Sequence, residues 1–230
     1  MGWFSKSPNA MREKALRGAP AGPLRDYLSV PLPDPSTPLD ELPLLAVDLE
    51  TTGLDPTRDH VLSVGFVPVD GGEIVLSGAR RVIIAADAEV GQSATVHGLT
   101  DDDIAAGAAL VVAIEAVLRA LRGRVLLAHF ARIEDTFLTA ACERLWSARM
   151  PSARVDTLTL QHRLVASAFT GDVPEGGLRL WGARAHFGLP VYRAHDALVD
   201  ALACAELYLA QAAEFQAAAK GPLTLASIAE

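Results

Sequence analysis

Residues 44–50, with the sequence LLAVDLE, constrain this chain more than any other segment. The nearly continuous apolar run is typical of a β-strand that is buried on both faces. Side chains two residues apart on a strand lie on the same face, so the carboxylates of Asp48 and Glu50 project together. Charge in such a place costs free energy unless something compensates it. We interpret the pair as a candidate site, the alternative being a solvated strand end.

Strands and helices are expected to alternate after this strand. Residues 61–69 and 73–84 are rich in β-branched residues and flank Asp70-Gly71-Gly72, which predicts a hairpin. Further strands are expected over residues 124–128 and 154–155, and helices over residues 101–106, 108–121, 130–145, 178–187 and 196–219. This order predicts a three-layer α/β fold, in which a mixed sheet is flanked by helices.

The two ends of the chain differ in composition from its centre. Residues 1–40 are polar and punctuated by proline, with a short helix expected over residues 9–17. We expect residues 1–40 to be an extension or linker, residues 41–215 to be the domain and residues 216–230 to be a tail. The sequence shows no secretory signal and no run of about 18 apolar residues, so we expect a cytoplasmic protein without membrane association.

The formal net charge of the 230-residue chain is -8. This excludes a protein that relies on a broad basic surface to hold nucleic acid. Any nucleic-acid partner must therefore be held locally.

A third carboxylate has an unusual position on the expected helix over residues 130–145. On a helical wheel at about 100° per residue, one apolar arc collects Phe130, Ile133, Phe137, Leu138, Ala141 and Leu145. Glu134 falls in the middle of this arc, and Asp135 lies about 100° further round. Only Glu134 can face the core directly, and there it needs a cation, a proton or water.

His195 and Asp200 begin the last expected helix. A histidine at a helix start beside a loop can exchange protons with solvent, and its unperturbed pKa lies near neutrality. Asp200 lies one turn into the helix and can reach a metal shared with the strand carboxylates. Each residue alone has a structural interpretation, as a turn residue or part of a solvated face, but their combination with Glu134 favours a site.

Four motifs occur in order along the chain: residues 46–54 read AVDLETTGL, 96–100 read VHGLT, 156–158 read DTL and 195–201 read HDALVDA. In these motifs the chain resembles the DEDDh 3′-to-5′ exonucleases, the family of the proofreading epsilon subunit of the bacterial replicative polymerase. The resemblance covers residues 44–209. It implies an RNase H-like fold with a mixed five-stranded sheet, and a location in the bacterial cytoplasm.

A further segment, between the VHGLT and DTL motifs, departs from the family's pattern. The family usually reads H-N-A-x-F-D-x-x-F-L, whereas residues 129–138 read HFARIEDTFL. The family's aspartate falls on Glu134, the residue that the helical wheel also selects, so Asp135 is the less favoured ligand. The extra methylene of glutamate displaces the carboxylate, so metal geometry or rate is expected to differ from the family's.

The resemblance implies hydrolysis of phosphodiesters with two divalent metal ions, Mg²⁺ or Mn²⁺. It implies that Asp48 bridges both ions, that Glu50 and Asp200 complete the ion on the nucleophile side, and that Glu134 serves the ion on the leaving-group side. His195 would accept the proton of the attacking water. The product would be a nucleoside 5′-monophosphate.

The resemblance also implies a set of residues that contact the terminal nucleotide. For Phe137 a role in the core, and for His97 a structural role in a turn, are equally open. The expected substrate-binding residues are Thr51, Thr52, Gly53, Leu54, His97 and Phe137.

We therefore expect a metal-dependent 3′-to-5′ exonuclease that acts on nucleic acid 3′ ends, with single-stranded DNA favoured over RNA. One alternative is an exoribonuclease or oligoribonuclease-type enzyme with the same catalytic residues. The other is a non-catalytic binding module, in which the replacement at Glu134 accompanies a changed role. Nothing in the sequence indicates association with a polymerase.

Overall fold

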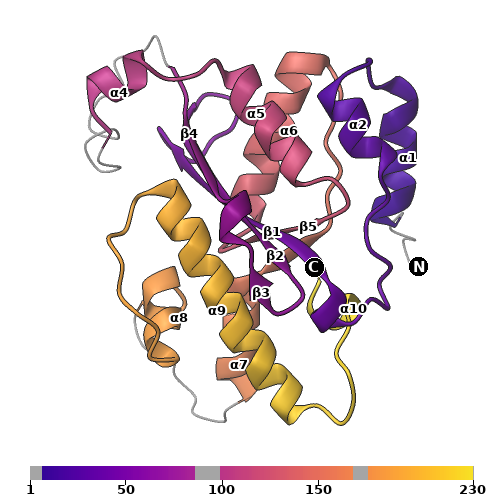
Figure 1. Cartoon of the computed structure of the whole chain (residues 1–230), viewed down its shortest axis with the longest axis vertical. Coiled ribbons are helices and arrows are strands. Elements are labelled where there is room, and N and C mark those ends of the chain that lie inside the picture. Colours follow the sequence, from indigo (N-terminus) through magenta and orange to yellow (C-terminus); the bar gives the residue numbers. More distant parts are fainter. Residues whose placement is uncertain (1–6, 86–98, 168–175, 230) are drawn as a thin grey trace.

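The computed structural model describes residues 7–85, 99–167 and 176–229, which form one mixed β-sheet with helices on both faces (Figure 1). The strands are β1 (Pro43–Thr51), β2 (Val61–Asp70), β3 (Glu73–Ile74), β4 (Arg80–Ile83), β5 (Val125–Ala128) and β6 (Arg154–Asp156). Their order is β3-β2-β1-β5-β6, and β4 also pairs with β2. The β1–β2 pair is antiparallel, and β1–β5 and β5–β6 are parallel. The expected α/β class is confirmed.

Helices supply the outer layers. The described helices are α1 (Pro8–Gly18), α2 (Pro23–Ser29), α4 (Asp101–Ala105), α5 (Leu110–Ala120), α6 (Arg132–Trp146), α7 (Thr157–Ser167), α8 (Leu180–His186), α9 (Ala197–Ala218) and α10 (Leu225–Ile228), with 3₁₀ turns η1 (Leu39–Glu41) and η2 (Leu76–Gly78). Among the described residues, none of these helices is long and apolar enough to cross a membrane.

Strand β1 is buried on both faces, as its apolar run predicts. Leu45 and Val47 pack into a cluster with α5 and α6, whereas Leu44 and Ala46 pack into a second cluster with α9. Since side chains alternate along a strand, Asp48 continues the row that faces α9. The sheet thus directs the candidate carboxylates toward one particular helix.

The segment expected as one strand over residues 73–84 is split into β3 and β4 by η2, so the sheet has six strands instead of five. Proline has no N–H to donate to a strand ladder, and Pro68 lies in the interrupted stretch of β2. Its carbonyl accepts from Val75 N–H at 2.9 Å instead. A Cβ on Gly78 would lie 2.7 Å from the Pro68 ring. The break therefore follows from one residue of β2.

The N-terminal segment, expected as an extension or linker, packs against the domain. Leu24, Tyr27 and Leu28 of α2 are buried in the cluster that contains α5 and α6. Figure 1 shows α1 and α2 beside these helices, on the side of the molecule away from the first turn of α9.

A buried arginine fastens this N-terminal segment. Arg12 is only 2% exposed, and its guanidinium lies 4.1 Å from the centre of the Tyr27 ring. It donates to the carbonyls of Tyr27, of Val30 at 2.7 Å and of Pro151 at 3.2 Å. The Tyr27 hydroxyl also donates to the Pro151 carbonyl, at 3.0 Å. These bonds tie α1 and α2 to the loop before β6.

The C-terminal residues are likewise part of the fold. Helix α9 continues to Ala218, past the expected domain boundary, and α10 buries Leu225 and Ile228 in the second cluster. Isolated bridges join Thr224 to Pro38 and Ala229 to Val155. The expected tail therefore covers the α9 side of the sheet.

Replacing Arg12 by alanine should lower the free energy of unfolding by about 2–4 kcal/mol, because buried carbonyls would lose their donor. Arg17→Ala on the same helix, where the side chain is exposed, is the matched control and should change stability little. Urea denaturation followed by circular dichroism measures both. Equal small losses would show that Arg12 does not hold the N-terminal segment.

Candidate active site

Three carboxylates converge where β1 ends and α9 begins. Ligand oxygens of Asp48, Glu50 and Asp200 all lie within 4.8 Å of one another. Asp48 and Asp200 are half-buried, and Glu50 is 5% exposed. Carboxylate oxygens at such spacing are the donor set that a hard divalent cation takes. The geometry of these three residues therefore fits a metal ion.

A glycine on the neighbouring strand allows this convergence. Gly65 of β2 pairs with Asp48 of β1. A Cβ on Gly65 would lie 2.1 Å from the carbonyl carbon of Ala197 and 2.2 Å from the nitrogen of Leu198. Only a residue without a side chain lets the first turn of α9 approach the sheet this closely. That approach brings Asp200 to the two strand carboxylates.

Glu134 approaches the same group from the opposite helical layer. It lies in the first turn of α6, is 4% exposed, and its Oε2 has no hydrogen-bond partner among the described residues. Its charge raises the pKa of Asp48, so the two carboxylates are close. The adjacent Asp135 is engaged elsewhere, accepting from Ser152 Oγ at 2.6 Å and from Arg154 Nη1 at 2.7 Å. Of the two carboxylates, Glu134 is the one directed inward.

Burial raises the pKa of every carboxyl in this group. The pKa of Asp48 lies well above its usual range because of burial and then the nearby charge of Glu134. Burial raises the pKa of Glu50 to about 7 and that of Glu134 to about 8, and it also raises the pKa of Asp200. These four carboxyl groups therefore resist ionisation. When they are deprotonated they form a strongly negative site, and a bound cation would stabilise that ionised form.

An ion pair missed by the sequence analysis orients the start of α9. Arg81 of β4 contacts Asp196 Oδ2 at 2.7 Å. The Asp196 Oδ1 atom accepts from the backbone N–H groups of Leu198 at 3.0 Å and Val199 at 3.2 Å, which caps the helix. The Arg81 charge also offsets part of the rise that burial causes in the pKa of Glu50. Only the pairing of β4 with β2 brings Arg81 here, and no local pattern predicts that register.

His195 precedes α9 at the surface. Its side chain is exposed, its backbone has φ of 68°, and its N–H donates to Asp200 Oδ2 at 3.0 Å. This hydrogen bond connects the expected proton acceptor to the acidic group through the backbone.

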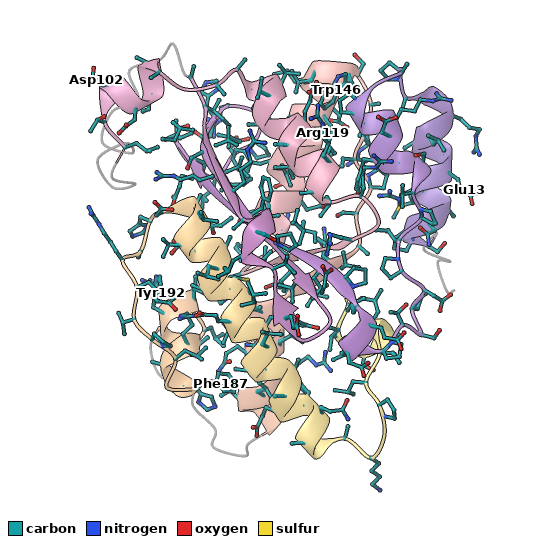
Figure 2. All side chains as sticks on the ribbon, viewed as in Figure 1. Glu13, Asp102, Arg119, Trp146, Phe187 and Tyr192 are labelled. Carbon is teal, nitrogen blue, oxygen red and sulfur yellow. The ribbon has the colours of Figure 1, made fainter. Side chains whose placement is uncertain are left out.

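A second network missed by the sequence analysis anchors the segment that carries His195. Arg184 of α8 is 1% exposed and donates to the carbonyls of Ala203 at 2.6 Å and Pro190 at 2.8 Å. It also donates to Glu206 Oε2 at 2.8 Å, while the Tyr192 hydroxyl donates to Glu206 Oε1 at 2.8 Å. Figure 2 shows Tyr192 on the segment that joins α8 to α9. Hydrogen bonds at Pro190 and Tyr192 thus fix the segment before it reaches His195.

The expected substrate-binding residues after β1 form a tight turn. The Thr52 N–H donates to the His60 carbonyl at 3.0 Å, and the His60 N–H donates to Thr52 Oγ1 at 2.9 Å. The Thr51 hydroxyl donates to the Gly53 carbonyl at 2.6 Å. A Cβ on Gly53 would lie 2.5 Å from the Asp59 carboxylate, which accepts from the backbone N–H of Asp55 at 2.8 Å, so a side chain here would displace that carboxylate. The turn leaves the next residue, Leu54, 73% exposed.

The other two expected contacts differ in their placement. Phe137 is 3% exposed and belongs to the core cluster of α5 and α6, while its surface also lines a cavity of about 450 Å³ with His60 and Arg144. His97 lies outside the described residues.

Asp156 of the DTL motif fixes the start of α6. Its carboxylate accepts from the backbone N–H groups of Phe130 at 2.9 Å, Ala131 at 3.0 Å and Leu158 at 2.9 Å. His129 is held nearby, with Nδ1 at 2.9 Å from Thr157 Oγ1. Burial lowers the pKa of His129 to about 4, so this histidine is neutral near pH 7.

A family model described as exonuclease matches residues 45–208, which contain all four carboxylates and His195. The chain belongs to this exonuclease family. The resemblance inferred from the motifs is confirmed, and so is the expectation of an exonuclease.

Curated relatives of this exonuclease domain come from bacteria. It is 29% identical to the DNA polymerase III subunit epsilon of Treponema pallidum, over 71% of this chain and 73% of the relative. It is 30% identical to a DNA polymerase III subunit epsilon-like protein of Rhodobacter capsulatus, over 75% of this chain and 24% of the relative. For a DNA polymerase III PolC-type protein of Thermotoga maritima the identity is 27%, over 77% of this chain but 12% of the relative.

Solved exonucleases share the fold. E. coli exonuclease I in complex with a dT13 oligonucleotide superposes with a TM-score of 0.63 at 17% identity, over 77% of this chain and 43% of the other. Exonuclease X in complex with 5′ overhanging duplex DNA superposes with a TM-score of 0.56 at 22% identity, over 74% of this chain and 92% of the other. The RNase H-like fold expected from the motifs is confirmed.

Replacing Gly65 by alanine should weaken Mn²⁺ binding by roughly tenfold or more, because a methyl group displaces the helix turn that carries Asp200. Isothermal titration calorimetry measures the affinity. Gly72→Ala is the matched control on the same hairpin, since its Cβ would meet nothing within 4 Å. Unchanged affinity in the Gly65 variant would contradict the packing argument.

Metal affinity should also rise with pH. With the pKa of Glu50 at about 7 and that of Glu134 at about 8, protons compete with cations for the same oxygens below these values. We expect Mn²⁺ affinity to increase about tenfold per pH unit for each proton displaced below pH 7, and to level off above pH 8. Calorimetry in buffers of differing ionisation enthalpy counts the protons released.

The same shifts act on stability when no metal is bound. The unfolded chain releases these protons at lower pH than the folded chain does, so the free energy of unfolding should fall as pH rises from the usual glutamate range to about 8. A flat profile of unfolding free energy and a pH-independent Mn²⁺ affinity would both contradict the raised pKa values.

Proposed function

We propose that this protein is a metal-dependent 3′-to-5′ exonuclease that releases nucleoside 5′-monophosphates from single-stranded DNA or frayed 3′ ends. The observation that carries the proposal is the convergence of Asp48, Glu50 and Asp200 within 4.8 Å, with the buried Glu134 beside Asp48. Burying such a cluster costs free energy, which a bound cation would offset.

We infer that two divalent ions, Mg²⁺ or Mn²⁺, bind here. Asp48 is the shared residue, because its ligand oxygen lies within 4.8 Å of those of Glu50 and Asp200, and the charge of Glu134 also acts on it. We infer that Asp48 would contact both ions, Glu50 and Asp200 the first, and Glu134 the second. Such a pair of ions stabilises the attacking and leaving oxygens of a phosphodiester.

His195 is the residue proposed to accept a proton from the attacking water. Its exposed position at the start of α9 lets it pass that proton on to solvent. The hydrogen bond from its backbone to Asp200 and the Arg184 network limit how far it can move from the acidic group.

Leu54 and the turn of Thr51–Gly53 are proposed to contact the terminal nucleotide, with Phe137 and His97 as further candidates. The exposed side chain of Leu54 suits an apolar contact with a base. The dT13 complex of the structural neighbour favours DNA as the substrate, with RNA as the alternative.

A non-catalytic binding module would have to keep two buried carboxylate oxygens that lack hydrogen-bond partners among the described residues. Glu134 Oε2 and Asp200 Oδ1 have no hydrogen-bond partner among the described residues. Leaving such groups buried without a bound cation lowers stability, which favours the enzyme over the binding module.

Substituting the ligands tests the mechanism. Asp200→Asn and Glu134→Gln should each lower the rate on a 5′-labelled single-stranded oligonucleotide on the order of a thousandfold, since each removes a charged metal ligand. Product ladders on denaturing gels with Mg²⁺ and Mn²⁺ measure the rate and the direction of digestion.

Asp135→Asn is the matched control for Glu134→Gln, because it changes the adjacent carboxyl group. It should keep the rate and lose about 1 kcal/mol of stability through the Arg154 ion pair. A rate loss in the Asp135 variant alone would reverse the assignment, and digestion from the 5′ end would refute the proposed polarity. Parallel assays with RNA of the same sequence decide between the two substrates.

A further inference from the structure

Phe130 departs from the expected pattern in both conformation and environment. The helical wheel places it in the apolar arc of a helix over residues 130–145, but α6 begins only at Arg132. Phe130 is 47% exposed and lies in none of the three apolar clusters formed by the described residues. The core therefore does not account for an aromatic residue at this position.

The backbone of Phe130 is strained. Its φ of 70° lies in the left-handed region, which bulky residues rarely occupy and which asparagine and glycine tolerate much better. Three hydrogen bonds impose the conformation: Asp156 accepts from the N–H groups of Phe130 and Ala131, and the Phe130 carbonyl accepts from Ile133 N–H at 3.0 Å. The fold thus holds an exposed aromatic ring where a small polar residue would be more stable.

This residue lies at the same end of the parallel strands as the acidic group. In the parallel pair of β1 and β5, Ala46 is level with Leu127. Asp48 lies two residues beyond Ala46, and Phe130 follows the last residue of β5 by two, so both come at the C-terminal end of this parallel pair. Glu134 follows Phe130 by about one helical turn on the same segment. An exposed arginine, Arg132, follows Phe130 by two residues in the chain.

We propose that Phe130 is a stacking platform for a base of the substrate strand, adjoining the metal site. The inference rests on the proposed function and names a residue that sets how the strand is held. A net charge of -8 gives the phosphates of a strand no overall attraction to the protein, whereas stacking on an aromatic ring does not depend on net charge. Every base offers a π-face, so Phe130 contributes affinity for a strand without selecting its sequence.

The test compares strands with and without bases. For oligothymidylate, Phe130→Ala should raise KM roughly five- to a hundredfold with little change in kcat. For the same strand with tetrahydrofuran abasic residues at its last three positions, the substitution should leave KM unchanged. Phe130→Trp should restore the low KM on oligothymidylate. Leu76→Ala, an exposed apolar residue of η2, is the matched control and should change neither substrate.

A stability measurement separates this role from a structural one. Phe130→Asn removes the ring and suits the left-handed backbone, so it should raise the melting temperature by about 2 °C while raising KM on oligothymidylate. A residue kept for packing would instead show a lower melting temperature with unchanged KM.

The inference is overturned if Phe130→Ala leaves KM unchanged on oligothymidylate or raises it equally on the abasic strand. The same comparison on Kd, by fluorescence anisotropy with Ca²⁺ in place of Mg²⁺, decides the matter without turnover. If the wild-type protein binds the base-containing strand more tightly through Phe130 but hydrolyses neither strand, the proposed function fails and the stacking role stands.

Discussion

The burial of like charges near the C-terminal end of the central strand β1 is the constraint that the site's surroundings must satisfy. Asp48 and Glu50 lie on the face of β1 that α9 covers, Asp200 comes from α9 itself, and Glu134 is enclosed at the start of α6. Burial raises the pKa of each of these carboxyl groups, and the charges of the other members add to the rise at Asp48 and Glu50, so the cluster opposes folding when it is ionised. Bound divalent cations would turn this cost into a source of stability, because they bind the folded arrangement and not the unfolded chain.

Neighbouring residues hold this unfavourable arrangement in place. Gly65 lets α9 approach the sheet, Arg81 fixes the cap of α9 through Asp196, and Arg184 anchors the segment before His195. None of these residues is among the proposed metal ligands. They nevertheless decide whether Asp200 of α9 meets the two carboxylates of β1 within the reach of a cation.

Local patterns in the sequence predict the strand pair Asp48 and Glu50 and the inward position of Glu134. The apolar run before Asp48 predicts a buried strand, and its period of two places Asp48 and Glu50 on one face. The helical wheel separates Glu134 from Asp135, and the structure gives these neighbours different surroundings. The α/β class follows from the alternation of such segments.

Contacts between residues far apart in the chain determine the parts of the fold and of the site that local sequence patterns do not predict. The docking of α1 and α2 depends on carbonyls of Val30 and Pro151 that receive the Arg12 guanidinium, and residues 12 and 151 are far apart in the chain. The contacts of Gly65 and Arg81 depend likewise on strand register. Phe130 was misplaced in a helix because the wheel assumes helical geometry up to the first residue, whereas Asp156 holds Phe130 in a left-handed turn.

Anomalous diffraction from crystals grown with Mn²⁺ tests the central claim most directly, namely that the buried carboxylates exist to bind cations. The account predicts two manganese peaks about 3.5–4 Å apart, one among Asp48, Glu50 and Asp200 and one between Asp48 and Glu134. Crystals in which these carboxylates remain protonated and hydrogen-bonded to one another, with no manganese peak beside Asp48, would contradict it.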